Sequence, residues 1–383
     1  MEAICVLKQV SPKLTSFVAK LKKLIDRRDN RGKRHELDFV LAGVVLAIMS
    51  GRSYASSIYR FIVNRIAWLR DTLGHPEANP VSRAQLPRIL DGIDWDDLNE
   101  IVFQHFGVKI EVKGQEWYAL DGKTLRGIPG SKDRVLLAVS HTERKIVAQK
   151  PMQGVKESEI PAVREMLAET GLAKGKVTLD ALHFNPTTTQ QFNQAGGLFI
   201  IQLKDNQPTL FDQMSQEAAE AVPLALVKSS EKSHGRLEVR QGTLFDVSHL
   251  KLDPRWDESG LTTLIVMSRR TTEIAKQKSS AEVSFYLSNA SVEPGDEQLP
   301  KELFTAIRGH WGVEADNYIR DVSFQEDQVK TKHGNQGQVL ATLRTLAMQL
   351  FREAKIKNFR AALETFSDCP EQFETFLKLY RFL

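Results

Sequence analysis

Three acidic residues occupy positions where carboxylates could act together on a bound metal ion: Asp121, Asp180 and Glu314. Asp121 and Asp180 each close a short apolar run typical of a β-strand, and Glu314 lies in a segment with helical character. Cleavage and transfer of phosphodiesters commonly use two divalent ions about 3.5–4 Å apart. Mg²⁺ is typically held by one or two carboxylates together with the substrate phosphate, so three acids suffice. The order strand, strand, helix therefore indicates metal-dependent phosphodiester chemistry.

The same segments allow other interpretations. Asp180 with His183, and His310 with Glu314, have the spacing of metal ligands on a helix and could form a zinc hydrolase site. His183 and His310 could also contact phosphate or simply lie in the core. The pair Asp121-Gly122 is, by itself, an ordinary turn sequence. Only the joint placement of the three acids favours catalysis over these alternatives.

The elements that must gather these acids are predicted from residue 117 onward. Short apolar runs at 117–121, 134–141 and 145–152 indicate three strands joined by short turns. Two more strands follow, each reached through a helix, which predicts a mixed sheet of ribonuclease H-like topology. The first strand is central in that topology and the fourth lies beside it, so Asp121 and Asp180 would be neighbours. The predicted helices are 159–170, 186–195 and 209–222, and the later strands are 176–182 and 198–204.

The flanking segments complete an α/β fold with four predicted parts. Residues 1–108 are predicted to form an all-helical N-terminal domain, with helices at 12–28, 37–50, 54–73, 82–90 and 95–106. A short helix with arginines beside a longer one, at 82–106, could be a helix-turn-helix. The first part of the catalytic core is 109–228, and a β-rich insertion follows at 229–290, with strands at 236–247, 261–270 and 281–288. Residues 291–383 return to the core with helices at 300–322 and 336–355.

Composition narrows the class of protein. The chain has 383 residues and a net charge of +4, with ordinary hydrophobic and charged fractions of 42% and 26%. Cys5 and Cys369 lie at opposite ends, which excludes a disulfide framework and suits a cytoplasmic protein. The longest apolar run, Phe39–Met49, is too short for a bilayer, and no signal peptide is visible. Eight basic and two acidic residues lie in 20–34, which is either a solvated helix end or a phosphate-contacting arm.

Longer motifs resemble those of a known family. The N-terminal segments GKRH at 32–35 and GRSY at 51–54 resemble the domain associated with the DDE transposases of bacterial insertion sequences. The remaining motifs resemble the same enzymes, and most closely the H-repeat-associated transposases. These motifs are LDGKTLRG at 120–127, DALH at 180–183, LKDNQPTL at 203–210, SHGR at 233–236 and RGHWGVE at 308–314.

The resemblance implies a transposase that cleaves DNA and transfers strands. It would bind the double-stranded ends of its insertion sequence through residues 1–108 and basic segments of the insertion, and it would also bind target DNA. Asp121, Asp180 and Glu314 would be the catalytic residues and the ligands of two Mg²⁺ (or Mn²⁺) ions. A homodimer on DNA, at the nucleoid in the cytoplasm and away from membranes, is implied as well. The candidate DNA contacts are Lys123, Arg126, His183, Lys204, Arg236, Arg308 and His310.

The sequence departs from the family pattern around the glutamate. Ile307, His310 and Asp321 stand where related transposases have Tyr, Arg and Lys, and only Glu314 matches the signature. The spacing from Glu314 to Asp321 is one residue shorter than in the group pattern, which rotates later helical positions by about 100°. An inactive transposase that only binds DNA is therefore an alternative. A third is a structure-directed nuclease of the same fold.

Overall fold

The structure is a computed structural model that describes residues 15–29, 33–107, 110, 114–125, 134–152, 159–233, 235–331 and 334–383. The chain divides into two compact units. The helical unit contains residues 1–108, 124–135 and 316–383, and the sheet unit contains residues 109–123 and 136–315. The expected β-rich insertion therefore belongs to the same unit as the strands before it, and the C-terminal helices group with the N-terminal ones.

The helical unit forms around α2 (Leu37–Met49), which is buried from Asp38 to Met49. Since this helix is apolar nearly all round, it can only be stable with other helices on every side. α11 (Gly334–Glu353) packs against α2, α5 and α6, so N- and C-terminal segments share one hydrophobic core. The other helices of the unit are α1 (Phe17–Leu21), α3 (Ala55–Asn64), α4 (Ile66–Leu73), α5 (Gln85–Asp91), α6 (Trp95–Phe106), α12 (Phe359–Asp368) and α13 (Pro370–Leu379).

Two of the predicted helices differ from the structure. The single helix predicted at 54–73 is two helices, α3 and α4, because Arg65 between them has φ −111° and ψ 16°, outside helical geometry. Within the described part of the helix predicted at 12–28, only α1 is an α-helix, and it ends at Leu21. Pro87 is accommodated because it is the third residue of α5, where a helix needs no backbone N–H donor.

The sheet unit is built on a mixed sheet. The described strands form a nine-stranded sheet in the order β3-β2-β1-β4-β5-β9-β8-β7-β6. In it, β1, β4 and β5 are parallel to one another, and each neighbouring pair from β5 through β9, β8 and β7 to β6 is antiparallel. The first five strands are β1 (Trp117–Thr124), β2 (Arg134–Ser140), β3 (Ile146–Met152), β4 (Lys176–Leu179) and β5 (Leu198–Leu203). The expected mixed α/β architecture and the adjacency of β1 and β4 are both confirmed.

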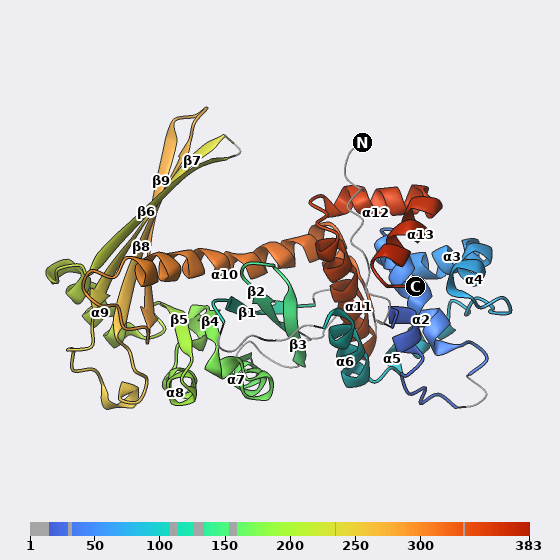
Figure 1. The fold of residues 1–383 in the computed structure, drawn as a ribbon, viewed down its shortest axis with the longest axis horizontal. Helices are drawn as coiled ribbons and strands as arrows, with labels where there is room; N and C mark the ends of the chain where they lie inside the picture. Colours follow the sequence, from blue (N-terminus) through green and yellow to red (C-terminus); the bar gives the residue numbers. More distant parts are fainter. Residues whose placement is uncertain are drawn as a thin grey trace. The chain divides into compact units, whose positions relative to one another are not determined.

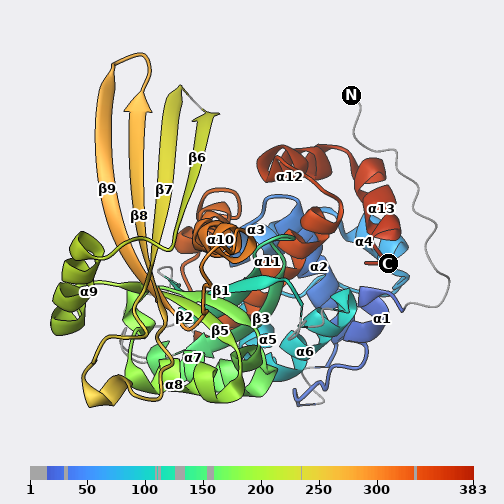
Figure 2. The same ribbon diagram turned by 60° about the vertical axis from the view of Figure 1, so that its left-hand side comes forward.

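Helices cover the two faces of this sheet (Figures 1 and 2). α7 (Glu159–Thr170) and α8 (Pro186–Ala195) connect the strands on one face, where Tyr118 and Leu120 enter the core. α10 (Gln298–Val322) lies over the other face, where Leu303, Ala306 and Ile307 pack with Trp117 and Ile200. The alternation of side chains along β1 therefore sends Trp117, Ala119 and Asp121 toward α10.

The insertion continues the sheet as long antiparallel strands. They are β6 (Ala225–Ser233), β7 (Arg236–Asp246), β8 (Thr263–Glu273) and β9 (Lys278–Ser288). α9 (Pro208–Glu220) packs on the inner end of β8, and the outer halves of the strands extend beyond it (Figures 1 and 2). Strand β6 was not predicted, since its sequence lacks an apolar alternation and its side chains are mostly exposed. None of the helices in the described part of the chain has the length and apolar character that a membrane crossing requires.

Candidate active site

The pairing of β1 with β4 brings Asp121 and Asp180 side by side. The parallel register aligns Trp117 with Lys176 and Ala119 with Thr178. Asp121 lies two residues beyond Ala119, and Asp180 lies two residues beyond Thr178, just past the end of β4, so a continuation of this register would align the two aspartates. Neighbouring strands lie about 4.8 Å apart, and residues in register point to the same face. Both carboxylates therefore start from adjacent positions on the α10 face.

The two aspartates have different local settings. Asp121 lies within β1, which continues to Thr124, so the expected end of this strand at Asp121 is corrected. β4 ends at Leu179, three residues before the expected Leu182, because Asp180 caps the 3₁₀ turn Ala181–His183. Its side chain accepts a hydrogen bond from the Leu182 N–H, at 3.1 Å. One carboxylate oxygen of Asp180 is thereby fixed in orientation.

Helix α10 carries Glu314 toward this pair. Nδ1 of His310 lies 3.0 Å from Oγ1 of Thr178, which is two residues before Asp180 on β4. Glu314 is one helical turn beyond His310. Roughly 6–7 Å separates residues i and i+2 on a strand, or i and i+4 on a helix. Asp180 and Glu314 therefore lie at similar distances along the chain direction from the contact between Thr178 and His310.

Two glycines let α10 approach the turn between β2 and β3. A Cβ on Gly309 would lie 2.2 Å from Nδ1 of His141, and one on Gly312 would lie 2.5 Å from the Arg144 guanidinium. Arg144 also donates a hydrogen bond to the carbonyl of Gly312. Larger residues at these positions would push the helix away from the sheet. The glycines are therefore part of what positions Glu314.

Neighbouring acids affect the pKa values of Asp121 and Glu314. Burial raises the pKa of Asp121 to about 6, and the nearby charges of Glu159, Asp180 and Glu314 add to this effect. Burial also raises the pKa of Glu314, with Asp180 adding to it and Lys204 opposing it. Carboxyl groups that repel one another in a partly buried site gain most from binding a cation. The oxygen-only donor set of the three acids fits the preference of Mg²⁺ or Mn²⁺.

A fourth acid, Glu159, was not predicted from the sequence. It begins α7, is buried, and places its carboxylate against β1, where a Cβ on Gly122 would lie 2.5 Å from it. Its Oε1 lies 3.2 Å from Nε2 of His183, and the same nitrogen lies 3.7 Å from Oδ1 of Asp180. His183 thus bridges Glu159 and Asp180. No spacing in the sequence distinguishes Glu159 from the other acids of its helix.

The histidines of the site are held in place by the fold. His183 is completely buried, so it is not available to DNA as an exposed cation. His310 shares Oγ1 of Thr178 with His141, whose Nε2 lies 3.1 Å away. Burial lowers the pKa of His310 to about 4 and that of His141 to about 3. At neutral pH, any contact that His310 makes with phosphate would be a neutral hydrogen bond.

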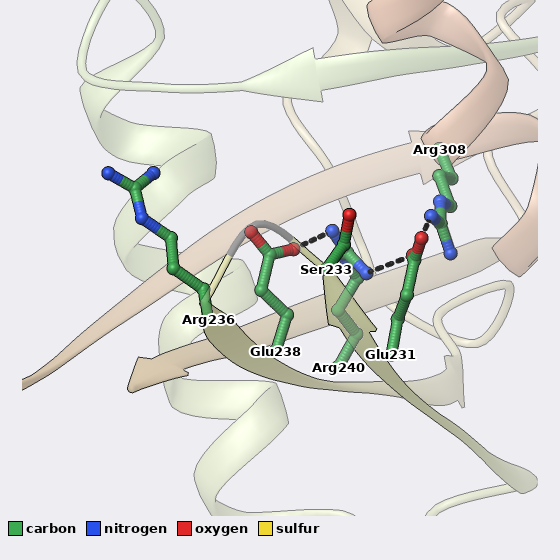
Figure 3. A pocket seen from close by; sticks show the side chains of 6 residues that line it. All are labelled: Glu231, Ser233, Arg236, Glu238, Arg240 and Arg308. Carbon is green, nitrogen blue, oxygen red and sulfur yellow. Dashed lines mark hydrogen bonds and ion pairs between the residues drawn. The ribbon is translucent and has the colours of Figure 1, made fainter. Parts of the chain in front are cut away.

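The other expected DNA contacts lie in several places. Lys204 is exposed directly after β5, and its positive charge opposes the rise in the pKa of Glu314. Lys123, in contrast, is buried in β1. Arg236 and Arg308 line one cavity of about 230 Å³ between β6, β7 and α10. Figure 3 shows Arg308 paired with Glu231 and Arg236 pointing away from the other side chains. Arg126 lies outside the described residues.

Trp311 is an exposed aromatic residue beside the site. It lies three residues before Glu314 on α10 and is 48% exposed, and the Arg269 guanidinium stands 5.7 Å from its ring centroid. A large exposed aromatic ring with a cation over it is unusual, since such side chains are normally buried. The sequence gives no signal that this tryptophan is exposed.

On one face of the outer halves of β6–β9, the charged side chains among the described residues are all basic, and exposed apolar side chains lie between them. By the register, the side chains opposite α10 include Lys228, Lys232 and Arg270, and no acidic residue lies among them from Leu226 to Lys232 and their partners. The face toward α10 instead mixes both signs. Its charged residues are Glu231, Arg236, Glu238, Arg240, Arg269, Glu273, Lys278 and Glu282.

Comparison with known proteins places the chain among transposase relatives. Residues 18–106 match the family described as "DDE_Tnp_1-associated". The chain is 25% identical to "Putative transposase YncI" of Escherichia coli O157:H7, over 86% of this chain and 85% of the relative. It is 27% identical to "H repeat-associated putative transposase YhhI" of Escherichia coli K12, over 88% and 90%. It is 30% identical to "Uncharacterized protein in dhlA 3'region" of Xanthobacter autotrophicus, over 64% of this chain and 84% of that protein.

Proposed function

The chain belongs to the family of H-repeat-associated transposases, and we propose that it binds the ends of its insertion sequence and cuts and joins DNA there. The observation that carries this proposal is the parallel register of β1 with β4, whose continuation would bring Asp121 beside Asp180. The strand order β3-β2-β1-β4-β5, with β1, β4 and β5 parallel, supports a ribonuclease H-like core.

Asp121, Asp180 and Glu314 are the residues that would hold divalent metal ions. Such ions, when bound, activate the attacking hydroxyl or water and stabilise the leaving oxygen. The protein's part is to fix the carboxylates: β1 and β4 set the two aspartates in register, the 3₁₀ turn holds Asp180, and α10 presents Glu314. His183 lies between Glu159 and Asp180, with its Nε2 3.2 Å from the first carboxylate and 3.7 Å from the second.

The residues of α10 beyond Glu314 have a structural role, which is compatible with an active enzyme. The shorter spacing after Glu314 rotates the later positions of the helix, and α10 continues without interruption through them to Val322. Its later residues are used in the helical unit: Asp316 pairs with Arg352, and Arg320 donates to Oγ1 of Thr345. The changed spacing is thus accommodated by regular helical packing. The inactive, DNA-binding alternative rests on the sequence departures alone.

The surface that we assign to DNA is the face of β6–β9 opposite α10, on the outer halves of the strands. Lys228, Lys232 and Arg270 give it a net positive charge, and the phosphate backbone attracts such a face without regard to sequence. The α5–α6 pair is a weaker candidate for a helix-turn-helix. Its second helix begins with Asp96 and Asp97 in the first turn, where a recognition helix contacts bases.

Cleavage of a labelled duplex carrying the element's ends, with Mg²⁺ or Mn²⁺, tests the proposal. We expect cutting and strand-transfer products from the native chain and none from Asp121→Asn or Asp180→Asn. Asp205→Asn, an exposed aspartate in the same unit, is the matched control and should cut normally. Full cleavage by either active-site variant would refute the assignment. Binding without cleavage by the native chain would support the DNA-binding alternative, and cleavage without strand transfer would support a nuclease.

A further inference from the structure

Glu36, Asp38 and His75 form a second cluster of potential metal ligands, in the helical unit and apart from the candidate active site. One ligand atom from each lies within 4.8 Å of the other two, and the described residues contain no other such group of three. Glu36 is the N-cap residue of α2, Asp38 lies in its first turn, and His75 follows the end of α4. The start of one helix and the end of another thus converge.

The contacts of the His75 ring are unequal. Nδ1 contacts a carboxylate oxygen of Glu36, and Nε2 lies 3.2 Å from Oδ2 of Asp38. This second contact is not a hydrogen bond, because Nε2 and Oδ2 are both buried atoms without a hydrogen-bond partner among the described residues. The side chains of His75 and Asp38 are only 9% and 10% exposed. Leaving two such buried atoms unsatisfied is unfavourable.

A metal ion explains this geometry better than an ion pair. Ligand atoms of a tetrahedral ion with bonds of about 2.1 Å lie about 3.4 Å apart, and both point at the ion instead of at each other. The 3.2 Å between Nε2 and Oδ2, without hydrogen-bond direction, fits that arrangement. A ligating histidine usually donates its other N–H to a carboxylate, and Glu36 is in that position.

The charge of the cluster also favours a cation. The N-terminus of a helix carries roughly half a positive charge, which would repel an ion at the start of α2. The two carboxylates outweigh it. One imidazole nitrogen together with carboxylate oxygens suits Zn²⁺ and related divalent transition metals. We propose that Asp38 and His75 bind a divalent transition-metal ion such as Zn²⁺, with Glu36 orienting the imidazole and water completing the coordination. The ion joins the start of α2 to the end of α4.

Zinc titration of the full-length chain carrying Asp121→Asn and Asp180→Asn tests this site. These substitutions remove two acids of the proposed active site, so the outcome does not depend on the proposed function. Isothermal titration calorimetry should show one Zn²⁺ site, and Co²⁺ in place of Zn²⁺ should give a visible absorption band. Adding His75→Ala or Asp38→Asn should abolish both signals. Adding Glu36→Gln should weaken binding by about 10–100-fold.

His35→Ala is the matched control, because His35 lies in the same region but its Nδ1 contacts the Asn79 carbonyl, at 3.0 Å. This variant should bind Zn²⁺ like its parent. Asp38→Asn preserves side-chain volume, and circular dichroism would establish that it is folded. Equal Zn²⁺ binding by all variants would overturn the proposal. Absence of Zn²⁺ binding by the parent would do so as well, and would leave a metal-free pair of His75 with its two carboxylates.

Discussion

Asp121→Asn should abolish cleavage and yet stabilise the metal-free protein at neutral and alkaline pH. The pKa of Asp121 is raised to about 6, because it is buried and faces Glu159, Asp180 and Glu314. At pH 8 its carboxylate is charged in a site that already holds negative charge. Asparagine occupies the same volume without that charge. A residue essential for activity therefore lowers the stability of the protein in the absence of metal.

The size of the effect follows from linkage. Between its ordinary pKa of 3.8 and the folded value of about 6, Asp121 binds more protons in the folded state than in the unfolded state. The free energy of unfolding therefore falls as pH rises through this range, and the loss is complete above it. One pKa unit corresponds to 1.36 kcal/mol, so the loss is about 3 kcal/mol at pH 8. Near pH 4 the native carboxyl is mostly protonated in the folded state, and the variant has little advantage.

Urea unfolding in EDTA at pH 4.5 and pH 8 would measure this difference. We expect Asp121→Asn to be more stable than the native chain by about 3 kcal/mol at pH 8 and by only about 1 kcal/mol at pH 4.5. Mg²⁺ should then raise the stability of the native chain more than that of the variant. Asp205→Asn is the control and should change stability by less than about 0.5 kcal/mol at either pH. A variant that is less stable than the native chain at pH 8 in EDTA would refute the reasoning.

Three further predictions follow from the structure. Replacing Lys228, Lys232 and Arg270 together with alanine should make the negative slope of log DNA affinity against log salt less steep by about 2.7, or 0.9 per phosphate contact. A salt series of binding isotherms measures this slope. Lys278→Ala, on the opposite face, should change the slope less, and an equal change would argue against the assigned face. Gly122→Ala should destabilise the protein by about 1–3 kcal/mol in urea unfolding, because its Cβ would lie 2.5 Å from the Glu159 carboxylate, and Glu159→Ala should relieve the loss. Glu159→Gln should lower the pKa of Asp121 in an NMR titration, whereas Glu165→Gln, on the exposed side of α7, should leave it unchanged.

The sequence predicted the elements whose patterns are local. Alternating or continuous apolar runs marked the core strands to within a few residues, and the helices at 159–170 and 186–195 have the predicted bounds. Patterns failed where context decides the structure. The break at Arg65 leaves the helical periodicity on either side intact, and β6 is an exposed strand held by pairing with β7. The periodicity of apolar residues predicts neither feature.

The acids at 121, 180 and 314 could be singled out as candidates because two of them follow strand-like apolar runs and the third lies in a helical segment. The family resemblance then assigned them a shared role. What the sequence could not give is any property that depends on neighbours distant in the chain. Glu159 enters the site only because Gly122 leaves room for its carboxylate against β1. His310 is neutral only because the fold buries it against Thr178. Residue types and spacing thus led to a hypothesis about the local chemistry of the chain. Burial, charge state and the pairing of remote side chains were decided by tertiary packing, because each depends on atoms that the linear sequence does not place together.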